Sequence, residues 1–161
     1  MSLSLEKNVA WEGSIRRILY KQLFVRPKPL QSSVSLSGKI GLITGANSGL
    51  GFEAARQLFQ LGLSHLILAV RSQAMGDDAF RKLNEEFPNA VMDVWIMDMA
   101  DYDSVVAFAN RCRNLERLDF AILNAGVQIS TFRRSEKTGH EMTLQTNYFS
   151  TVLLVLFSPQ S

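Results

Sequence analysis

The stretch Thr44-Gly45-Ala46-Asn47-Ser48-Gly49-Leu50-Gly51 lies between a short apolar run, residues 39–44, and an amphipathic stretch that begins at Gly49. The apolar run is typical of a buried strand and the amphipathic stretch of a helix. Gly45 allows a sharp turn after the strand, and Gly51 allows the helix to pack close to it. Gly49 lacks a Cβ, so backbone N–H groups there can approach a phosphate group at the helix N-terminus. The turn therefore predicts a pyrophosphate cradle, because a strand precedes it and a helix follows it.

The amphipathic stretch, residues 49–61, has one polar and one apolar face. Its polar residues recur at helical spacing and predict the solvent face: Glu53, Arg56, Gln57 and Gln60. Its apolar residues predict the inward face: Leu50, Ala54, Ala55, Leu58 and Leu61. Gly62 then suits a helix C-cap.

The same alternation continues along the chain. Further apolar runs predict strands at residues 65–70, 91–97 and 118–123. Helices are expected at 74–87, from a cap at Asp101 or Asp103 to about Arg113, and at 139–157. Near-continuous apolar strands separated by helices indicate a parallel sheet covered on both faces. The predicted fold class is α/β, a doubly wound parallel sheet of the Rossmann type, of which the chain carries the N-terminal part.

Composition narrows the class of protein. The chain has 161 residues, of which 47% are hydrophobic, so it can bury a core. With 17 Lys+Arg and 15 Asp+Glu the charge is balanced and interleaved, which gives no case for a nucleic-acid partner. The lone Cys112 excludes an internal disulfide framework and a thiolate metal cage, and the two histidines, His65 and His140, lack metal-ligand spacing.

The first 37 residues are expected to form a separate N-terminal part, followed by the Rossmann domain at 38–161. Residues 11–25 show helical spacing, and Pro27, Pro29 and the following serines indicate an extended connector. This helix is expected to pack on the main domain; contact with a membrane is the weaker alternative. The early residues have no signal-peptide pattern and no run is long enough to span a bilayer, so a cytoplasmic location is expected.

Polar residues follow the second, third and fourth predicted strands, at the edge where ligands bind in such sheets. Arg71 stands where an acid would bind the ribose of NAD, and a guanidinium there suits a 2′-phosphate, which predicts NADP(H); a solvated surface arginine is the alternative. Asp98 suits an adenine amino group or a loop cap. Asn124, in Asn124-Ala125-Gly126, suits a bond to a neighbouring strand or a turn.

These motifs together resemble the short-chain dehydrogenase/reductase family over about residues 38–157, and Asn147 also falls at the family's spacing. A narrower likeness to fungal secondary-metabolite reductases rests on residues 22–25, 51–56, 69–71 and 102–105. The resemblance implies hydride transfer between a carbonyl and an alcohol, NADP as cofactor, and dimers or tetramers. It also implies cofactor contacts at the positions Gly45, Asn47, Ser48, Gly49, Leu50, Gly51, Arg71, Asp98, Met99, Asn124, Ala125 and Gly126, and a catalytic place for Asn147.

The chain departs from the family pattern at its end. No Tyr-x-x-x-Lys follows Asn147, and the sequence stops at Ser161 before the strand that carries the family's serine. Two hypotheses therefore stand: an NADP-dependent reductase by descent, or an inactive truncated remnant that binds cofactor or a partner. The apolar end of the last helix, residues 152–157, is expected to be buried at an interface between copies. The substrate cannot be predicted, because the family's substrate loops lie mostly beyond this sequence.

Overall fold

The computed structural model describes residues 14–25 and 34–157. It divides into two units, Met1–Val34 and Ser35–Ser161. In the first, α3 (Ile15–Phe24) begins after Ser14, whose Oγ accepts a hydrogen bond from the Arg17 N–H. The helix expected at 11–25 is thus confirmed from residue 15; its first residues and most of the predicted connector lie outside the described residues.

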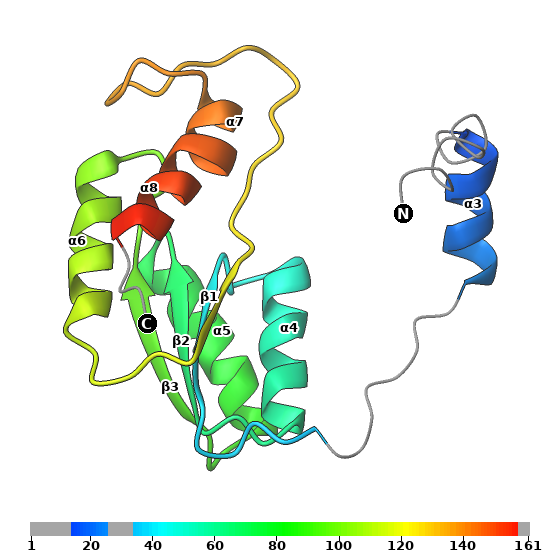
Figure 1. The fold of residues 1–161 in the computed structure, drawn as a ribbon, viewed down its shortest axis with the longest axis vertical. Helices are drawn as coiled ribbons and strands as arrows, with labels where there is room; N and C mark the ends of the chain where they lie inside the picture. Colours follow the sequence, from blue (N-terminus) through cyan, green and yellow to red (C-terminus); the bar gives the residue numbers. More distant parts are fainter. Residues whose placement is uncertain (1–13, 26–33, 158–161) are drawn as a thin grey trace, which may run out of the picture. The chain divides into compact units, whose positions relative to one another are not determined.

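The second unit is built on one parallel sheet (Figure 1). Its strands are β1 (Ile40–Thr44), β2 (His65–Val70), β3 (Val91–Ile96) and β4 (Phe120–Leu123), in the order β3-β2-β1-β4. In the register of the sheet, Ile43 of β1 pairs with Leu68 of β2 and with Ile122 of β4. The first three strands are added in one direction across the sheet, and the chain then returns to add β4 on the other side of β1. This change in the order of strand addition defines a doubly wound sheet, so the predicted fold class is confirmed.

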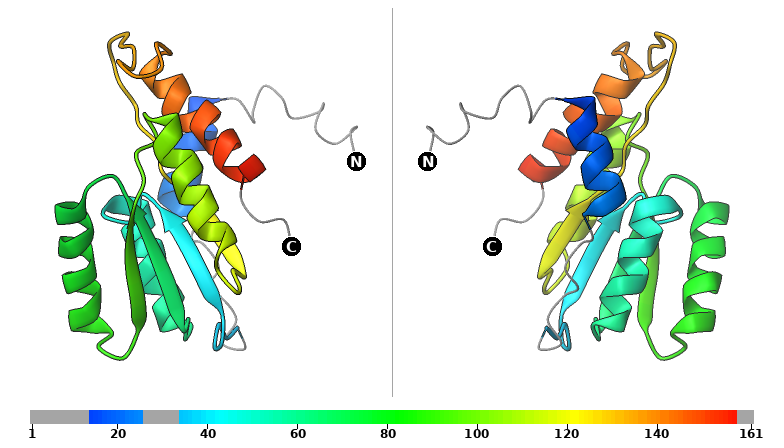
Figure 2. Two further views of the ribbon diagram at one scale, coloured as in Figure 1. Left: turned by 90° about the vertical axis from the view of Figure 1, so that its left-hand side faces the viewer. Right: turned by 90° about the vertical axis from the view of Figure 1, so that its right-hand side faces the viewer.

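Helices cover both faces of this sheet, with α4 (Gly49–Gln60) and α5 (Gln73–Glu86) on one side and α6 (Tyr102–Arg113) on the other (Figure 2). Alternate side chains of β2 point to opposite faces of the sheet and pack into different cores. Leu66 and Leu68 join the core that contains Ala55 of α4, whereas Ile67 joins the core that contains Val105 of α6. This two-sided burial explains why β2 is apolar from Leu66 to Val70, unlike a strand with one face in solvent.

The segment after β4 differs from the single helix expected at 139–157. It consists of α7 (Met142–Leu144), the π-helix η1 (Gln145–Phe149) and α8 (Ser150–Phe157). Residues 139–141 are not helical: Gly139 has φ +73°, and Glu141 forms an antiparallel bridge with Arg134. The Glu141 carboxylate accepts hydrogen bonds from the Thr143 and Leu144 N–H groups, so it caps the helix that follows.

One further expectation about a helix face was wrong. Leu50 is 82% exposed because the buried face of α4 is formed by Gly51, Ala55 and Phe59, and Leu50 points about 100° or more away from each of them around the helix axis. In α8, the side that meets α6 includes the buried Leu154, whereas Leu156 is 62% exposed; burial of this end between copies of the chain stays a prediction. The Gly62 cap is confirmed: its φ is +81°, and its N–H donates to the Phe59 carbonyl.

Candidate cofactor site

A pocket of about 420 Å³ lies at the carboxyl ends of the strands. Seven residues predicted from the sequence line it: Gly45, Asn47, Arg71, Asp98, Met99, Ala125 and Gly126. The remaining predicted residues, Ser48, Gly49, Leu50, Gly51, Asn124 and Asn147, are not part of its lining. The structure therefore gathers residues from four separate loops into one place, which is the edge of the sheet where ligands of such folds bind.

The glycine turn shows the close packing that its sequence predicts. Gly45 has φ +68°, and a Cβ there would come within 3.0 Å of the Ala125 Cα. A Cβ on Gly51 would lie 2.3 Å from the Gly45 carbonyl oxygen, so α4 can approach the turn only with glycine at that position. Gly49 has φ +56° and open space around its missing Cβ. The turn is thus crowded on its protein side and open at Gly49.

The N-terminus of α4 is open to an anion. Ser48 precedes it but makes no side-chain cap bond, and the first turn of the helix carries no acidic residue. Uncapped N–H groups and the helix dipole favour a negative group at this position. Asn47, in the same loop, donates from Nδ2 to the Met75 sulfur at 3.8 Å, which links the turn to α5.

Asn124 ties the turn to the neighbouring strand. Its Nδ2 donates to the carbonyl oxygens of Thr44, at 3.2 Å, and Gly45, at 3.3 Å. The Ala125 N–H donates to Thr44 Oγ1 at 2.9 Å, and Thr44 is almost fully buried. The expected bond from Asn124 to a neighbouring strand is confirmed, and it fixes the two strand ends between which the pocket opens.

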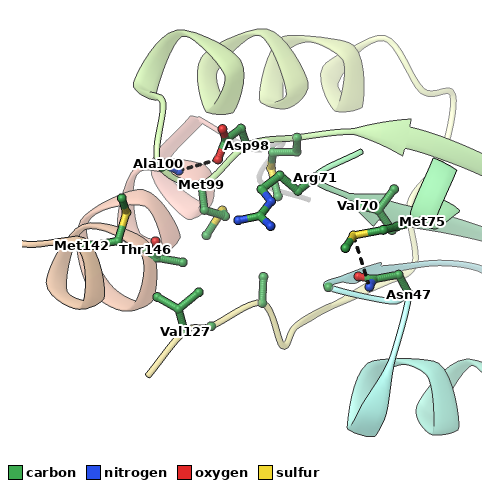
Figure 3. Close-up of a pocket in the computed structure, with 15 residues that line it drawn as sticks. Asn47, Val70, Arg71, Met75, Asp98, Met99, Ala100, Val127, Met142 and Thr146 are labelled. Carbon is green, nitrogen blue, oxygen red and sulfur yellow. Dashed lines mark hydrogen bonds between the residues drawn. The ribbon is translucent and has the colours of Figure 1, made fainter. Parts of the chain in front are cut away.

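Arg71 projects into the pocket from the end of β2 (Figure 3). Arg71 is exposed, and the structure shows no ion pair or hydrogen bond between it and another described residue. Ser72 caps α5 next to it, with Oγ accepting from the Met75 N–H at 3.4 Å, and the first turn of α5 carries no acid. A free guanidinium beside a helix N-terminus is a suitable place for a phosphate group.

Asp98 has a local structural role in the loop after β3. Its Oδ1 accepts from the Ala100 N–H at 2.9 Å, and its own N–H donates to Ser104 Oγ at 2.9 Å. These bonds shape the loop after β3, which agrees with the loop-carboxylate alternative. Because Asp98 also lines the pocket, the adenine contact stays a prediction.

Asn147 lies in η1 and pairs with the loop after β4. Its Oδ1 accepts from the Val127 N–H at 2.8 Å, and its Nδ2 donates to the Val127 carbonyl oxygen at 2.9 Å. A Cβ on Gly126 would lie 3.3 Å from the same Oδ1. The side chain of Asn147 therefore holds this loop in place, and a part in catalysis stays a prediction.

Several lining residues escaped prediction. Sequence reasoning named Met99, but Met75, Met97 and Met142 also line the pocket, as do Val127 and Thr146. Met75 faces the pocket from the first turn of α5, which a helical-wheel projection from the capping Ser72 could have indicated. Met142 and Thr146 reach it only because the segment after β4 folds back, and no pattern in the sequence predicts that.

Within the described ranges, no group of three or more His, Cys, Asp or Glu side chains is placed to hold a metal ion.

A parallel sheet with a glycine turn, an uncapped helix N-terminus and a pocket at the carboxyl edge defines a dinucleotide-binding α/β protein. Residues 39–158 match the family described as short chain dehydrogenase. The chain belongs to this family.

Three similar proteins give the extent of the likeness. The short chain dehydrogenase virL of Hypocrea virens is 51% identical over 97% of this chain and 46% of its own length. The short chain dehydrogenase opdN of Penicillium oxalicum is 45% identical over 97% of this chain and 51% of its own. A solved short chain dehydrogenase from Escherichia coli CFT073, in complex with NADPH, is 26% identical with a TM-score of 0.62 and covers 77% of this chain and 53% of that one. The chain spans about half the length of the curated relatives it matches.

Proposed function

We propose that this chain carries the NADP(H)-binding part of a reductase that transfers hydride between a carbonyl and an alcohol in fungal secondary metabolism. The observation that carries the proposal is Arg71, an exposed guanidinium directed into the pocket at the end of β2, where no acid stands. A carboxylate at this strand end would bind the ribose hydroxyls of NAD, whereas a guanidinium can clamp a 2′-phosphate.

The residues present fit a bound dinucleotide. The pyrophosphate is assigned to the uncapped N-terminus of α4, where the space beside Gly49 is open. The adenosine half is assigned to the wall formed by Arg71, Asp98 and Met99. When bound, NADPH would supply a hydride, which carries both electrons of the reduction, to a carbonyl carbon, and the carbonyl oxygen would take up a proton. This chain's own residues bind and orient the cofactor in that scheme; the donor of the proton is not identified among them.

The proposal is tested by titrating NADPH and NADH into the purified chain and into two arginine variants. Arg71→Ala should weaken NADPH binding by about 1.5–3 kcal/mol, roughly tenfold to a hundredfold, and leave NADH binding unchanged. Arg81→Ala is the matched control, because Arg81 lies on the exposed side of α5 and pairs with Asp78. Equal affinity of the wild-type chain for the two cofactors, or an unchanged NADPH affinity in Arg71→Ala, would refute the assignment.

The second candidate function is a non-catalytic cofactor-binding or association module. One observation favours it: α8 exposes Val152, Val155 and Leu156. The 161 residues contain no Tyr-x-x-x-Lys, and a catalytic acid contributes roughly 10²–10⁴-fold to such a reaction, so these residues by themselves should bind NADPH without turnover. Light scattering and an NADPH oxidation assay against a panel of ketones separate the two candidates. An oligomer that binds NADPH without turnover supports the module, and turnover by the 161 residues alone would refute it.

A further inference from the structure

Gln145 is a fully buried polar side chain whose amide is bonded at both ends. Its Oε1 accepts from Thr138 Oγ1 at 2.8 Å, and its Nε2 donates to Ser150 Oγ at 2.8 Å and to the Met99 carbonyl oxygen at 3.4 Å. An amide buried without partners is costly, so these three bonds select one arrangement of the elements that provide them. The elements are the loop after β3, the loop before α7, and η1 with α8.

The π turn is what brings Gln145 and Ser150 together. Residues five apart in an α-helix point about 140° away from each other around the axis. In η1 the Ser150 N–H donates to the Gln145 carbonyl, five residues back, so the two side chains lie on the same side of the helix. The Thr151 hydroxyl donates to the Thr146 carbonyl at the same spacing, at 3.3 Å, which supports the wider turn.

Gln145 and Ser150 both bond to the backbone of one wall of the pocket, at Met99. The Met99 carbonyl oxygen accepts from Ser150 Oγ at 2.6 Å as well as from Gln145. The neighbouring Ala100 carbonyl accepts from Ser135 Oγ at 3.1 Å. Met99 and Ala100 line the pocket, and Figure 3 shows Thr146, the residue after Gln145, facing the same space. The backbone that shapes the wall is therefore tied to η1 rather than to the sheet alone.

We propose that Gln145 and Ser150 are a pair of positioning residues that fix the adenosine-side wall of the cofactor pocket to the π turn. The inference rests on the proposed function, because it assigns the Met99 wall to the adenosine half of the dinucleotide. The pair does not touch the cofactor. It sets the position of the Met99 backbone, so it affects the binding of NADPH and NADH equally and does not act on the 2′-phosphate.

The test compares three variants of the full chain by titration with NADPH, NADH and 2′,5′-ADP, together with thermal unfolding. Gln145→Met keeps the volume of the side chain and removes its bonds; the dissociation constants of all three ligands should rise by a common factor of about three to ten. Ser150→Ala removes one bond to Met99 and should give a smaller rise of the same kind. Leu63→Ala is the control for stability alone, since Leu63 is buried just before β2, at the opposite end of the strands. It should lower Tm and leave the three constants unchanged.

Two results would overturn the inference. One is a Gln145→Met chain that unfolds at lower temperature but binds all three ligands as the wild type does, which would make the pair merely structural. The other is a loss confined to NADPH and 2′,5′-ADP, which would place the effect on the phosphate. If Gln145→Met does not fold, Ser150→Ala decides by the same criteria. A wild-type chain that binds no dinucleotide is a separate outcome: it refutes the proposed function, and the inference with it.

Discussion

Replacing Gly49 by alanine should weaken NADPH binding, whereas replacing Gly62 by alanine should not. The two glycines lie at opposite ends of α4 and share a left-handed backbone, with φ of +56° and +81°. At neither position would a Cβ meet another atom within 4 Å. An L-residue in this conformation costs about 1 kcal/mol, so both variants should lose similar stability, roughly 3–6 °C in Tm. The pair thus separates backbone strain from ligand contact.

The expected loss of affinity follows from the position of Gly49. A methyl group there fills the open space beside the α4 N-terminus, where the pyrophosphate is assigned. Losing one charge-assisted N–H bond to a phosphate costs about 1.5–3 kcal/mol, so the NADPH dissociation constant should rise at least about tenfold. Alanine suits this test better than valine, because a β-branched side chain at positive φ adds strain of its own.

NADPH fluorescence titration measures both constants, and thermal unfolding measures both stabilities. The reasoning requires equal losses of stability and unequal losses of affinity. If Gly49→Ala binds NADPH as tightly as Gly62→Ala does, the open space beside α4 is not the pyrophosphate cradle. Gly49 would then be needed only for its left-handed backbone conformation.

Three further outcomes are expected from other parts of the structure. Gly51→Ala should destabilise the fold by about 1–3 kcal/mol, in contrast to Gly49→Ala, because its Cβ would lie 2.3 Å from the Gly45 carbonyl oxygen; chemical denaturation measures the difference. Hydrogen bonds from Lys39 and from a backbone N–H hold the pKa of Asp119 well below its usual range, so the stability this group contributes is present above about pH 4 and is lost as the pH falls further. Asp119→Asn should therefore lower Tm at pH 7, and the two chains should converge in acid. Burial raises the pKa of the Cys112 thiol to about 11, so a thiol reagent at pH 8 should modify it only after urea unfolds the chain.

Elements buried on two faces were the most predictable part of the fold. Residues 65–70 were expected as a strand and form β2 with the same bounds, because a short apolar run between polar turns has few other places in a protein. Leu50 shows the limit of the same reasoning. Periodicity assigns it to the apolar face of α4, but the face that packs on the sheet is centred on Gly51, Ala55 and Phe59, and Leu50 lies outside it.

In the site, the sequence predicted the residues whose roles are local. The close approach at Gly51 and the bonds from Asn124 to the end of β1 follow from a strand, a turn and a helix that are neighbours in space. Met142 and Thr146 could not be assigned to the pocket, because their places depend on how a segment 16 residues or more beyond Gly126 returns to the sheet edge. That return is set by long-range bonds, such as the one from Ser135 to the Ala100 carbonyl, which no periodicity reports.

The π turn is the feature least accessible to sequence reasoning, and its cause is tertiary. Nothing in Gln145-Thr146-Asn147-Tyr148-Phe149 breaks an α-helix, and a glutamine and a serine five residues apart predict no contact in one. The wider turn costs helical hydrogen-bond geometry, which is why such turns are rare and occur mostly at functional positions. Here the cost is offset by bonds on both sides: Gln145 and Ser150 reach the Met99 carbonyl, and Asn147 pairs with Val127 in the loop after β4. An α-helical register would rotate one of these contacts away from its partner. The π turn is therefore the geometry in which a single helix can hold the loops after β3 and β4 together, and these two loops are the walls between which the cofactor is assigned.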